Sequence, residues 1–104
     1  GQVFLRAIPE DFEYWVSMGN DEWSYEQVLP YYRKLETDTN YSDDFHGTDG
    51  PIIAHRFQPD AWLDSPKAFY QACLDYGFQD TPDHNNPDST GVGPLPLTNP
   101  KCIR

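Results

Sequence analysis

The apolar residues of this 104-residue chain occur in short groups separated by polar stretches. In the first group, Phe12, Trp15 and Val16 have the spacing of one face of a helix. Pro9 suits the first helical position because its missing N–H would have no partner there. Gly19 can adopt the left-handed conformation that closes a helix. The pattern predicts a short helix that begins at Pro9 and ends before Gly19.

The second group, WSYEQVLPYYRKLE, carries another helical signal. Ser24 and Gln27 have the S-x-x-Q spacing of a capping box, which predicts a helix start at Ser24. Pro30 lacks a backbone N–H, so we expect the helix to break there and restart. We also expect Trp15 and Trp23 to be buried where the two helices pack.

Two further elements follow a polar loop at 37–50. The run PIIAHRF predicts a strand over Pro51–Phe57. In SPKAFYQACLDYGF, Ser65 is the expected N-cap and Gly77 the expected end of a helix. Its expected buried stripe is Ala68, Phe69, Ala72, Cys73 and Tyr76.

Periodicity stops at Asp80, and five of the ten prolines lie beyond it. The predicted fold class is therefore α+β, with mainly short helices, a few short strands and long irregular proline-rich segments. Such a long stretch without secondary structure is unusual inside a compact domain and is commonly functional or packed against something else.

The composition limits the kinds of molecule that this chain is expected to bind. Seventeen acidic against seven basic residues give a net charge of −10, which would repel phosphate backbones and anionic lipid head groups. We therefore expect no nucleic-acid partner, and no apolar run is long enough for a membrane span. Cys73 and Cys102 could form one disulfide, but we favour two reduced thiols in a cytoplasmic protein.

The stretch DDFHGTDGP could be a metal site, a catalytic dyad or a turn. The three histidines show neither HxH nor HExxH spacing, and the loop lacks the calcium-binding D-x-D-x-D-G pattern. The chain also has no G-x-S-x-G, P-loop or G-x-G-x-x-G motif. We therefore predict no metal-binding and no catalytic residue. His46 is expected to lie in a structural turn, in which Gly47 and Gly50 can adopt positive φ.

Several segments, in this order, resemble the glucose-methanol-choline (GMC) family of FAD-dependent oxidoreductases, whose members include choline dehydrogenases. They are GQVFLRAIPEDFEYW, GNDEWSYEQVLPYYRKLE, FHGTDGPI and DHNNPDSTGVGPLPLT. The first is similar to the segment that follows the family's flavin-contacting G-G-[ST]-S-x-x-N signature. The second and third resemble G-N-x-x-W-S-[YF]-x-x-[LV]-L-P-[YF]-[YF]-x-x-x-E and F-H-G-x-x-G-P-[LI].

The resemblance implies that the chain is an internal fragment from the N-terminal half of a larger flavoenzyme. Such a parent would oxidise a small alcohol to a carbonyl by passing a hydride to FAD. The family's catalytic histidine and its dinucleotide-binding glycine motif would lie outside this chain, so the fragment alone is expected to be inactive and to need the remainder of the flavoenzyme as its partner. The positions that match the backbone beside the flavin are Gly1, Gln2, Val3 and Phe4.

The expected organisation is one fragment. Residues 1–8 follow the flavin signature, residues 9–79 form lid and substrate-domain elements, and residues 80–104 form the extended proline-rich segment. Two other hypotheses remain. One is an independent acidic interaction module that uses exposed aromatic residues as anchors, and the other is a small hydrolase with paired carboxylates.

Overall fold

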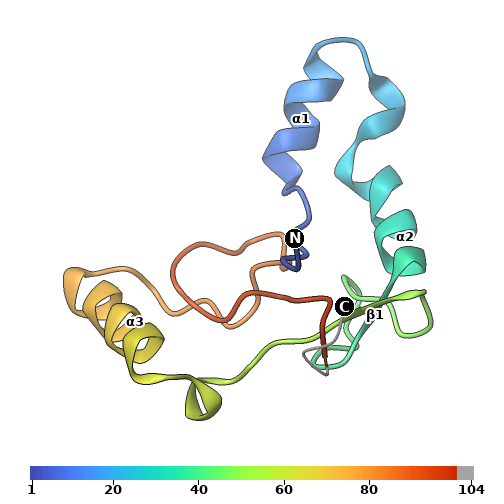
Figure 1. The fold of residues 1–104 in the computed structure, drawn as a ribbon. Coiled ribbons are helices and arrows are strands. Elements are labelled where there is room, and N and C mark those ends of the chain that lie inside the picture. Colours follow the sequence, from blue (N-terminus) through green and yellow to red (C-terminus); the bar gives the residue numbers. More distant parts are fainter. Residues whose placement is uncertain (101–104) are drawn as a thin grey trace.

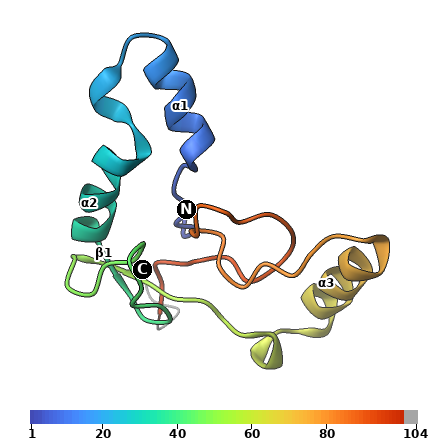
Figure 2. The same cartoon turned by 180° about the vertical axis from the view of Figure 1, so that it is seen from behind.

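The computed structural model describes residues 1–100, and Cys102 lies outside them. Two helices, α1 (Pro9–Ser17) and α2 (Tyr25–Leu35), form an arm on one side of the molecule, and α3 (Asp64–Tyr76) lies at the opposite end (Figure 1, Figure 2). Between them lie β1 (Glu36–Asp38), β2 (Ile52–Ala54) and an irregular tail, residues 80–100. Single 3-10 turns occupy Asp21–Trp23 and Pro59–Ala61. These elements agree with a small α+β unit.

The predicted start and end of the first helix and the predicted start of the second are confirmed. Pro9 is the first residue of α1, and Gly19 has a positive φ of 95°. Ser24 is the N-cap of α2, where its side chain accepts a hydrogen bond from the Gln27 N–H at 3.4 Å. The expected break at Pro30 is wrong, because α2 continues through this residue. Pro30 is exposed, so water can reach the part of the helix where a backbone hydrogen bond is missing.

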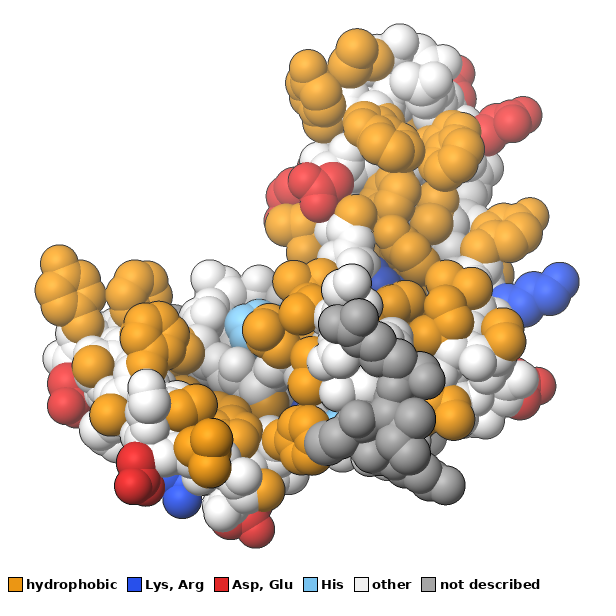
Figure 3. Space-filling view, viewed as in Figure 1, with side chains coloured by type: hydrophobic (Ala, Val, Ile, Leu, Met, Phe, Trp, Pro, Cys, Tyr) orange, Lys and Arg blue, Asp and Glu red, His pale blue; other side chains and the backbone are white. Residues whose placement is uncertain are grey.

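The expected burial of the tryptophans is also wrong. Trp15 and Trp23 are 48% and 50% exposed, although their rings meet edge to face with centroids 5.6 Å apart. Phe12 is the one buried residue of α1. The two helices contact each other, but within residues 1–100 no further layer covers the aromatic side of the arm (Figure 3).

The sheet is a parallel pair in which Glu36 is opposite Ile52 and Asp38 is opposite Ala54. The predicted strand at 51–57 therefore exists, but it is shortened to β2. An irregular ladder continues beside it: His55 pairs antiparallel with Leu97, and Leu97 pairs antiparallel with Val3. The N-terminus, the segment after β2 and the tail are thus held side by side.

Helix α3 begins two residues earlier than predicted, at Asp64. Its N-cap is Leu63, so the expected capping role of Ser65 is wrong, whereas Gly77 ends the helix as predicted with a φ of 111°. The expected buried stripe is wrong too, since Phe69 and Tyr76 are 68% and 86% exposed. A helical period shows which face is apolar, but it does not show that another element covers that face.

The chain is less compact than a typical domain of its size. Its accessible surface is 7205 Å², whereas a compact monomer of its mass exposes about 6,000 Å². Its radius of gyration is 15.2 Å, against about 13 Å expected for a compact domain. Among the described residues few apolar side chains are buried, namely Phe12, Ala54, Pro94 and Pro96, and apolar side chains cover much of the visible face (Figure 3). No helix within residues 1–100 is long and apolar enough to cross a membrane.

Candidate functional site

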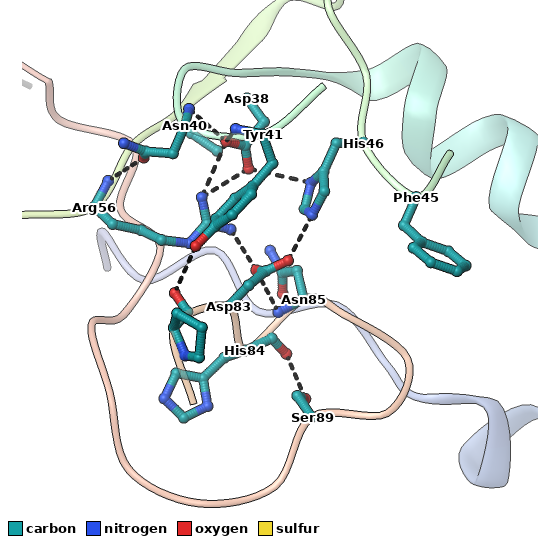
Figure 4. A network of polar contacts seen from close by, with 12 residues as sticks. Asp38, Asn40, Tyr41, Phe45, His46, Arg56, Asp83, His84, Asn85 and Ser89 are labelled. Atoms are coloured by element: carbon teal, nitrogen blue, oxygen red, sulfur yellow. Dashed lines mark hydrogen bonds and ion pairs between the residues drawn. The ribbon is translucent and has the colours of Figure 1, made fainter. Parts of the chain in front are cut away.

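A network of buried charged side chains lies between the sheet and the tail (Figure 4). These side chains come from segments far apart in the sequence and are at most 7% exposed. They are Arg6, Glu36, Asp38, His46, Arg56 and Asp83. Burial of this many charges is tolerated only when each is paired.

His46 lies at the centre of the network and is fully buried. Its Nδ1 lies 3.0 Å from Glu36 Oε1 and 3.2 Å from Asp38 Oδ2, and its Nε2 lies 2.7 Å from Asp83 Oδ2. Burial by itself would lower the pKa of His46, but the hydrogen bonds to three carboxylates outweigh burial and raise the pKa to about 11. His46 is therefore a permanent cation near neutral pH.

Arg56 closes the other side of the network. Its Nη1 donates to both carboxylate oxygens of Asp38, at 3.0 and 2.8 Å, and its Nη2 donates to Asp83 Oδ1 at 2.7 Å. The guanidinium also lies over the ring of Tyr41, 4.9 Å from its centroid. Burial opposes ionisation of Asp38, but hydrogen bonds from His46 and Arg56 hold its pKa below the usual range. Burial also opposes ionisation of Asp83, but hydrogen bonds from His46 and the Asn85 N–H, together with the charge of Arg56, hold its pKa below the usual range.

Arg6 links the network to the N-terminal segment. Its Nη1 donates to Glu36 Oε1 at 3.0 Å, and its guanidinium lies 5.2 Å from the centroid of the Tyr32 ring. With Arg6 included, three cationic and three anionic side chains balance. Because His46 stays protonated and both aspartates stay ionised near pH 7, the network is suited to fixing positions and unsuited to exchanging protons.

Glu36, Asp38 and His46 bring ligand-type atoms within 4.8 Å of one another, as a metal site would. Glu36 Oε2 has no hydrogen-bond partner among the described residues. However, two guanidinium groups and a protonated imidazole already balance the three carboxylates of the network. A metal ion would have to displace a guanidinium group or remove the His46 proton. The absence of a metal site stays a prediction.

The loop before β2 is a turn, as predicted, but the reason for its glycines differs. Neither Gly47 nor Gly50 has a positive φ. A Cβ on Gly47 would lie 1.8 Å from the Arg33 carbonyl oxygen, and one on Gly50 would lie 2.3 Å from the Glu36 nitrogen. Both glycines are required because the loop lies directly against the backbone at the end of α2. This close approach brings His46 into the network.

Replacing Gly47 with alanine is therefore expected to lower the free energy of unfolding by about 2–3 kcal/mol, because backbone atoms must move to admit the methyl group. Urea unfolding followed by tryptophan fluorescence would measure the loss. Thr48→Ala, at the exposed neighbouring position, should change stability by no more than about 0.5 kcal/mol. Equal stabilities for the two variants would show that Gly47 is not closely packed.

The predicted flavin-contacting residues Gly1, Gln2, Val3 and Phe4 form an outer segment of the irregular ladder. The Phe4 N–H donates to the Pro96 carbonyl at 2.8 Å, and the Thr98 N–H donates to the Gln2 carbonyl at 2.9 Å. Gly1 and Val3 are exposed, and Gln2 and Phe4 are half-buried. The structure places these residues together at the surface, and their contact with a flavin stays a prediction.

The three histidines do not converge. His46 is in the buried network, whereas His55 belongs to the ladder with Leu97. His84 lies 3.3 Å from the Gly93 carbonyl oxygen and lines an apolar groove of about 530 Å³ beside α3. Prominent among the other residues that line this groove are Phe57, Trp62, Phe69, Tyr70 and Leu97.

Sequence reasoning missed the charged network. Arg6, Glu36 and Arg56 resemble ordinary surface charges, and nothing in their spacing indicates that they meet. The available signal was that four of the six residues, Arg6, Glu36, His46 and Asp83, lie within the segments that resemble the GMC family. Motif positions that bear charge but have no catalytic role are candidates for this kind of structural pairing.

Solved structures show where such a fold occurs. Pyridoxine 4-oxidase from Mesorbium loti superposes with a TM-score of 0.83 at 29% identity, and the match covers 98% of this chain and 19% of that enzyme. An FAD-dependent oxidoreductase from Chaetomium thermophilum has a TM-score of 0.80 at 24% identity, covering 92% of this chain and 18% of the other, and shows the likeness of fold alone.

Curated relatives point the same way. An uncharacterized GMC-type oxidoreductase of Rhodococcus erythropolis is 45% identical over 97 residues, which are 93% of this chain and 19% of the relative. The oxygen-dependent choline dehydrogenase of Photobacterium profundum is 33% identical over 104 residues, all of this chain and 18% of the relative. This chain thus spans about one fifth of the length of these proteins. Because the sequence profile of GMC oxidoreductases matches residues 1–103, the chain belongs to the GMC oxidoreductase family.

Proposed function

We propose that this chain is part of an FAD-dependent oxidoreductase that oxidises an alcohol to a carbonyl. The observation that carries the proposal is the family match over residues 1–103. One relative is named a choline dehydrogenase and one structural neighbour a pyridoxine 4-oxidase. Both names describe oxidoreductases of small molecules, which supports an oxidation of the same class. The chain would contribute lid and substrate-domain elements around the site.

The N-terminal segment, residues 1–6, suits the neighbourhood of a flavin ring. Val3 and Leu5 are 52% and 55% exposed, so the segment offers an apolar surface on which a planar ring can pack. Nothing within 4 Å would meet a Cβ on Gly1, which leaves open space beside the backbone. Gly1, Gln2, Val3 and Phe4 would therefore lie against the ring system.

Residues outside this segment would have to bind the other parts of the cofactor. When bound, FAD supplies the acceptor for the hydride that leaves the alcohol. Its diphosphate needs a glycine loop at a helix N-terminus, and the sequence contains no such motif. The net charge of −10 also opposes binding of an anionic cofactor. The chain's own contribution would be to form one side of the site for the flavin ring and to exclude water from it.

The 104 residues produced alone are expected neither to retain FAD nor to oxidise an alcohol, whereas the intact protein that carries them should do both. The test is to mix each protein with FAD, remove free cofactor, record the visible spectrum and assay dye reduction with a panel of primary alcohols. An intact protein without a flavin band would refute the proposed function. A flavin band retained by the short chain would show that it holds more of the site than we propose.

The exposed aromatic residues favour a second candidate, an independent acidic interaction module. Trp15, Trp23 and Tyr31 are each about half exposed or more on the helical arm. Aromatic side chains of this kind commonly anchor protein interfaces. The same spectrum separates the two candidates, because a module without catalytic function has no reason to carry flavin in the intact protein.

A further inference from the structure

The N-terminal segment, residues 1–6, is held along one edge only. In an extended chain the backbone groups of alternate residues point to the same side. The carbonyl of Gln2 and the N–H of Phe4 are bonded to Thr98 and Pro96 on that side. No hydrogen bond within residues 1–100 involves the backbone groups of Val3 or Leu5, which point to the other side.

The paired edge is completed by one side chain, that of Asn85. Its Nδ2 donates to the Phe4 carbonyl at 2.9 Å, and its Oδ1 accepts from the Arg6 N–H at 3.0 Å. The amide thereby makes the two hydrogen bonds that a neighbouring strand would make to the residues flanking Leu5. Asn85 is 4% exposed, so these bonds are shielded from water.

Asn85 is in turn fixed by the charged network (Figure 4). Its backbone N–H donates to Asp83 Oδ1 at 3.0 Å, and its carbonyl accepts from Arg6 Nη2 at 2.9 Å. Asp83 is itself held by His46 and Arg56. Because all these contacts are buried and charge-assisted, the side-chain amide has one defined position.

We propose that Asn85 is a positioning residue for the flavin-facing segment: its side-chain amide locks residues 4–6 to the charged network and so sets where residues 1–4 meet the flavin ring. The inference rests on the proposed function and adds a residue to it. A rigid hold from one edge fixes the segment, and the face that carries the exposed Val3 and Leu5 side chains stays free to meet the cofactor. Displacements of about 1 Å in such a support are enough to disturb a cofactor site.

The variant Asn85→Ala tests the role closely, because it removes the two side-chain hydrogen bonds and keeps both backbone contacts of residue 85. The matched control is Asn86→Ala, whose side chain accepts only from the Asp88 N–H in the same loop. Both variants would be made in the intact protein. The measurements are amide hydrogen exchange at residues 4–6, the flavin absorption spectrum, and the dissociation of flavin on dilution.

We expect Asn85→Ala to speed exchange of the Arg6 amide at least about tenfold, the factor for a loss of roughly 1.4 kcal/mol, and to weaken flavin binding by a similar factor. Asn86→Ala should change neither quantity. Unchanged exchange at Arg6 in Asn85→Ala would overturn the proposal. Faster exchange with an unchanged flavin spectrum and affinity would overturn it as well, because the segment would then not position the flavin.

If Asn85→Ala does not fold, Asn85→Asp takes its place. The aspartate keeps an acceptor for the Arg6 N–H but sets an oxygen against the Phe4 carbonyl, which only the protonated acid can satisfy. We expect its flavin affinity, relative to the unsubstituted protein, to recover as pH falls from 8 to 5. A constant ratio would overturn the proposal. If the intact protein carries no flavin, the proposed function fails, and the exchange rates alone decide whether Asn85 holds the segment.

Discussion

Replacing Arg56 with methionine is expected to lower the free energy of unfolding by about 3–5 kcal/mol, the usual cost of removing one partner from a buried ion pair. Methionine preserves much of the apolar stem, so the loss would come from the guanidinium group. Without that group, Asp38 and Asp83 would lose their bonds from Arg56, and the buried network would carry an excess negative charge. The stacking on Tyr41 would also be lost.

Urea unfolding of the intact protein, followed by tryptophan fluorescence, measures this effect. Lys34→Met is the matched control, because it removes one positive charge from an exposed position in the last turn of α2. It should cost no more than about 0.5 kcal/mol. If Arg56→Met costs as little as the control, the buried ion pairs contribute nothing net and the network is not what holds the tail to the sheet.

Helix ends were the part of the fold that could be predicted from the sequence. Pro9, Ser24 and Gly77 act through the backbone within a few residues of themselves, so their roles do not depend on the rest of the chain. Ser65 and Pro30 show the limit of the same rules. Leu63 caps α3 without a side-chain hydrogen bond, and α2 tolerates a proline in an exposed turn.

Burial could not be predicted in the same way. The spacing of Phe69 and Tyr76 correctly indicated an apolar face on α3, but that face is exposed here. The same holds for Trp15 and Trp23 on the helical arm. Since the chain spans about one fifth of the proteins it resembles, the period of a helix cannot show whether the covering layer belongs to these residues.

The charged network was the feature that could least be predicted from the sequence. Arg6 and Asp83 are 77 positions apart, and their segments meet only in the folded chain, through the bonds of Asn85 to Phe4 and Arg6. The sequence correctly predicted a turn at His46, and the absence of a catalytic role for this residue stays a prediction. The turn itself did not reveal that its histidine would be the central cation of a buried ion cluster.

The protonation of His46 predicts how stability depends on pH. Because folding raises its pKa from about 6.5 to about 11, the stabilising contribution is complete below pH 6.5 and is lost progressively as pH rises toward 11. Asp38 and Asp83 have lowered pKa values, so their contribution is present above about pH 4 and is lost as pH falls further. The free energy of unfolding should therefore be largest between about pH 5 and 6.5.

His46→Gln isolates the alkaline side of this profile. At pH 6 it should cost about 3–5 kcal/mol, because it removes the cation that three buried carboxylates share. Between pH 7 and 10 its free energy of unfolding should fall less steeply than that of the unsubstituted protein, since glutamine has no proton to lose. His84→Gln, which replaces a histidine that contacts a carbonyl oxygen, should leave the slope unchanged. Parallel profiles for His46→Gln and the unsubstituted protein would mean that the folded chain holds His46 neutral, and the buried carboxylates would then depend on the two arginines alone.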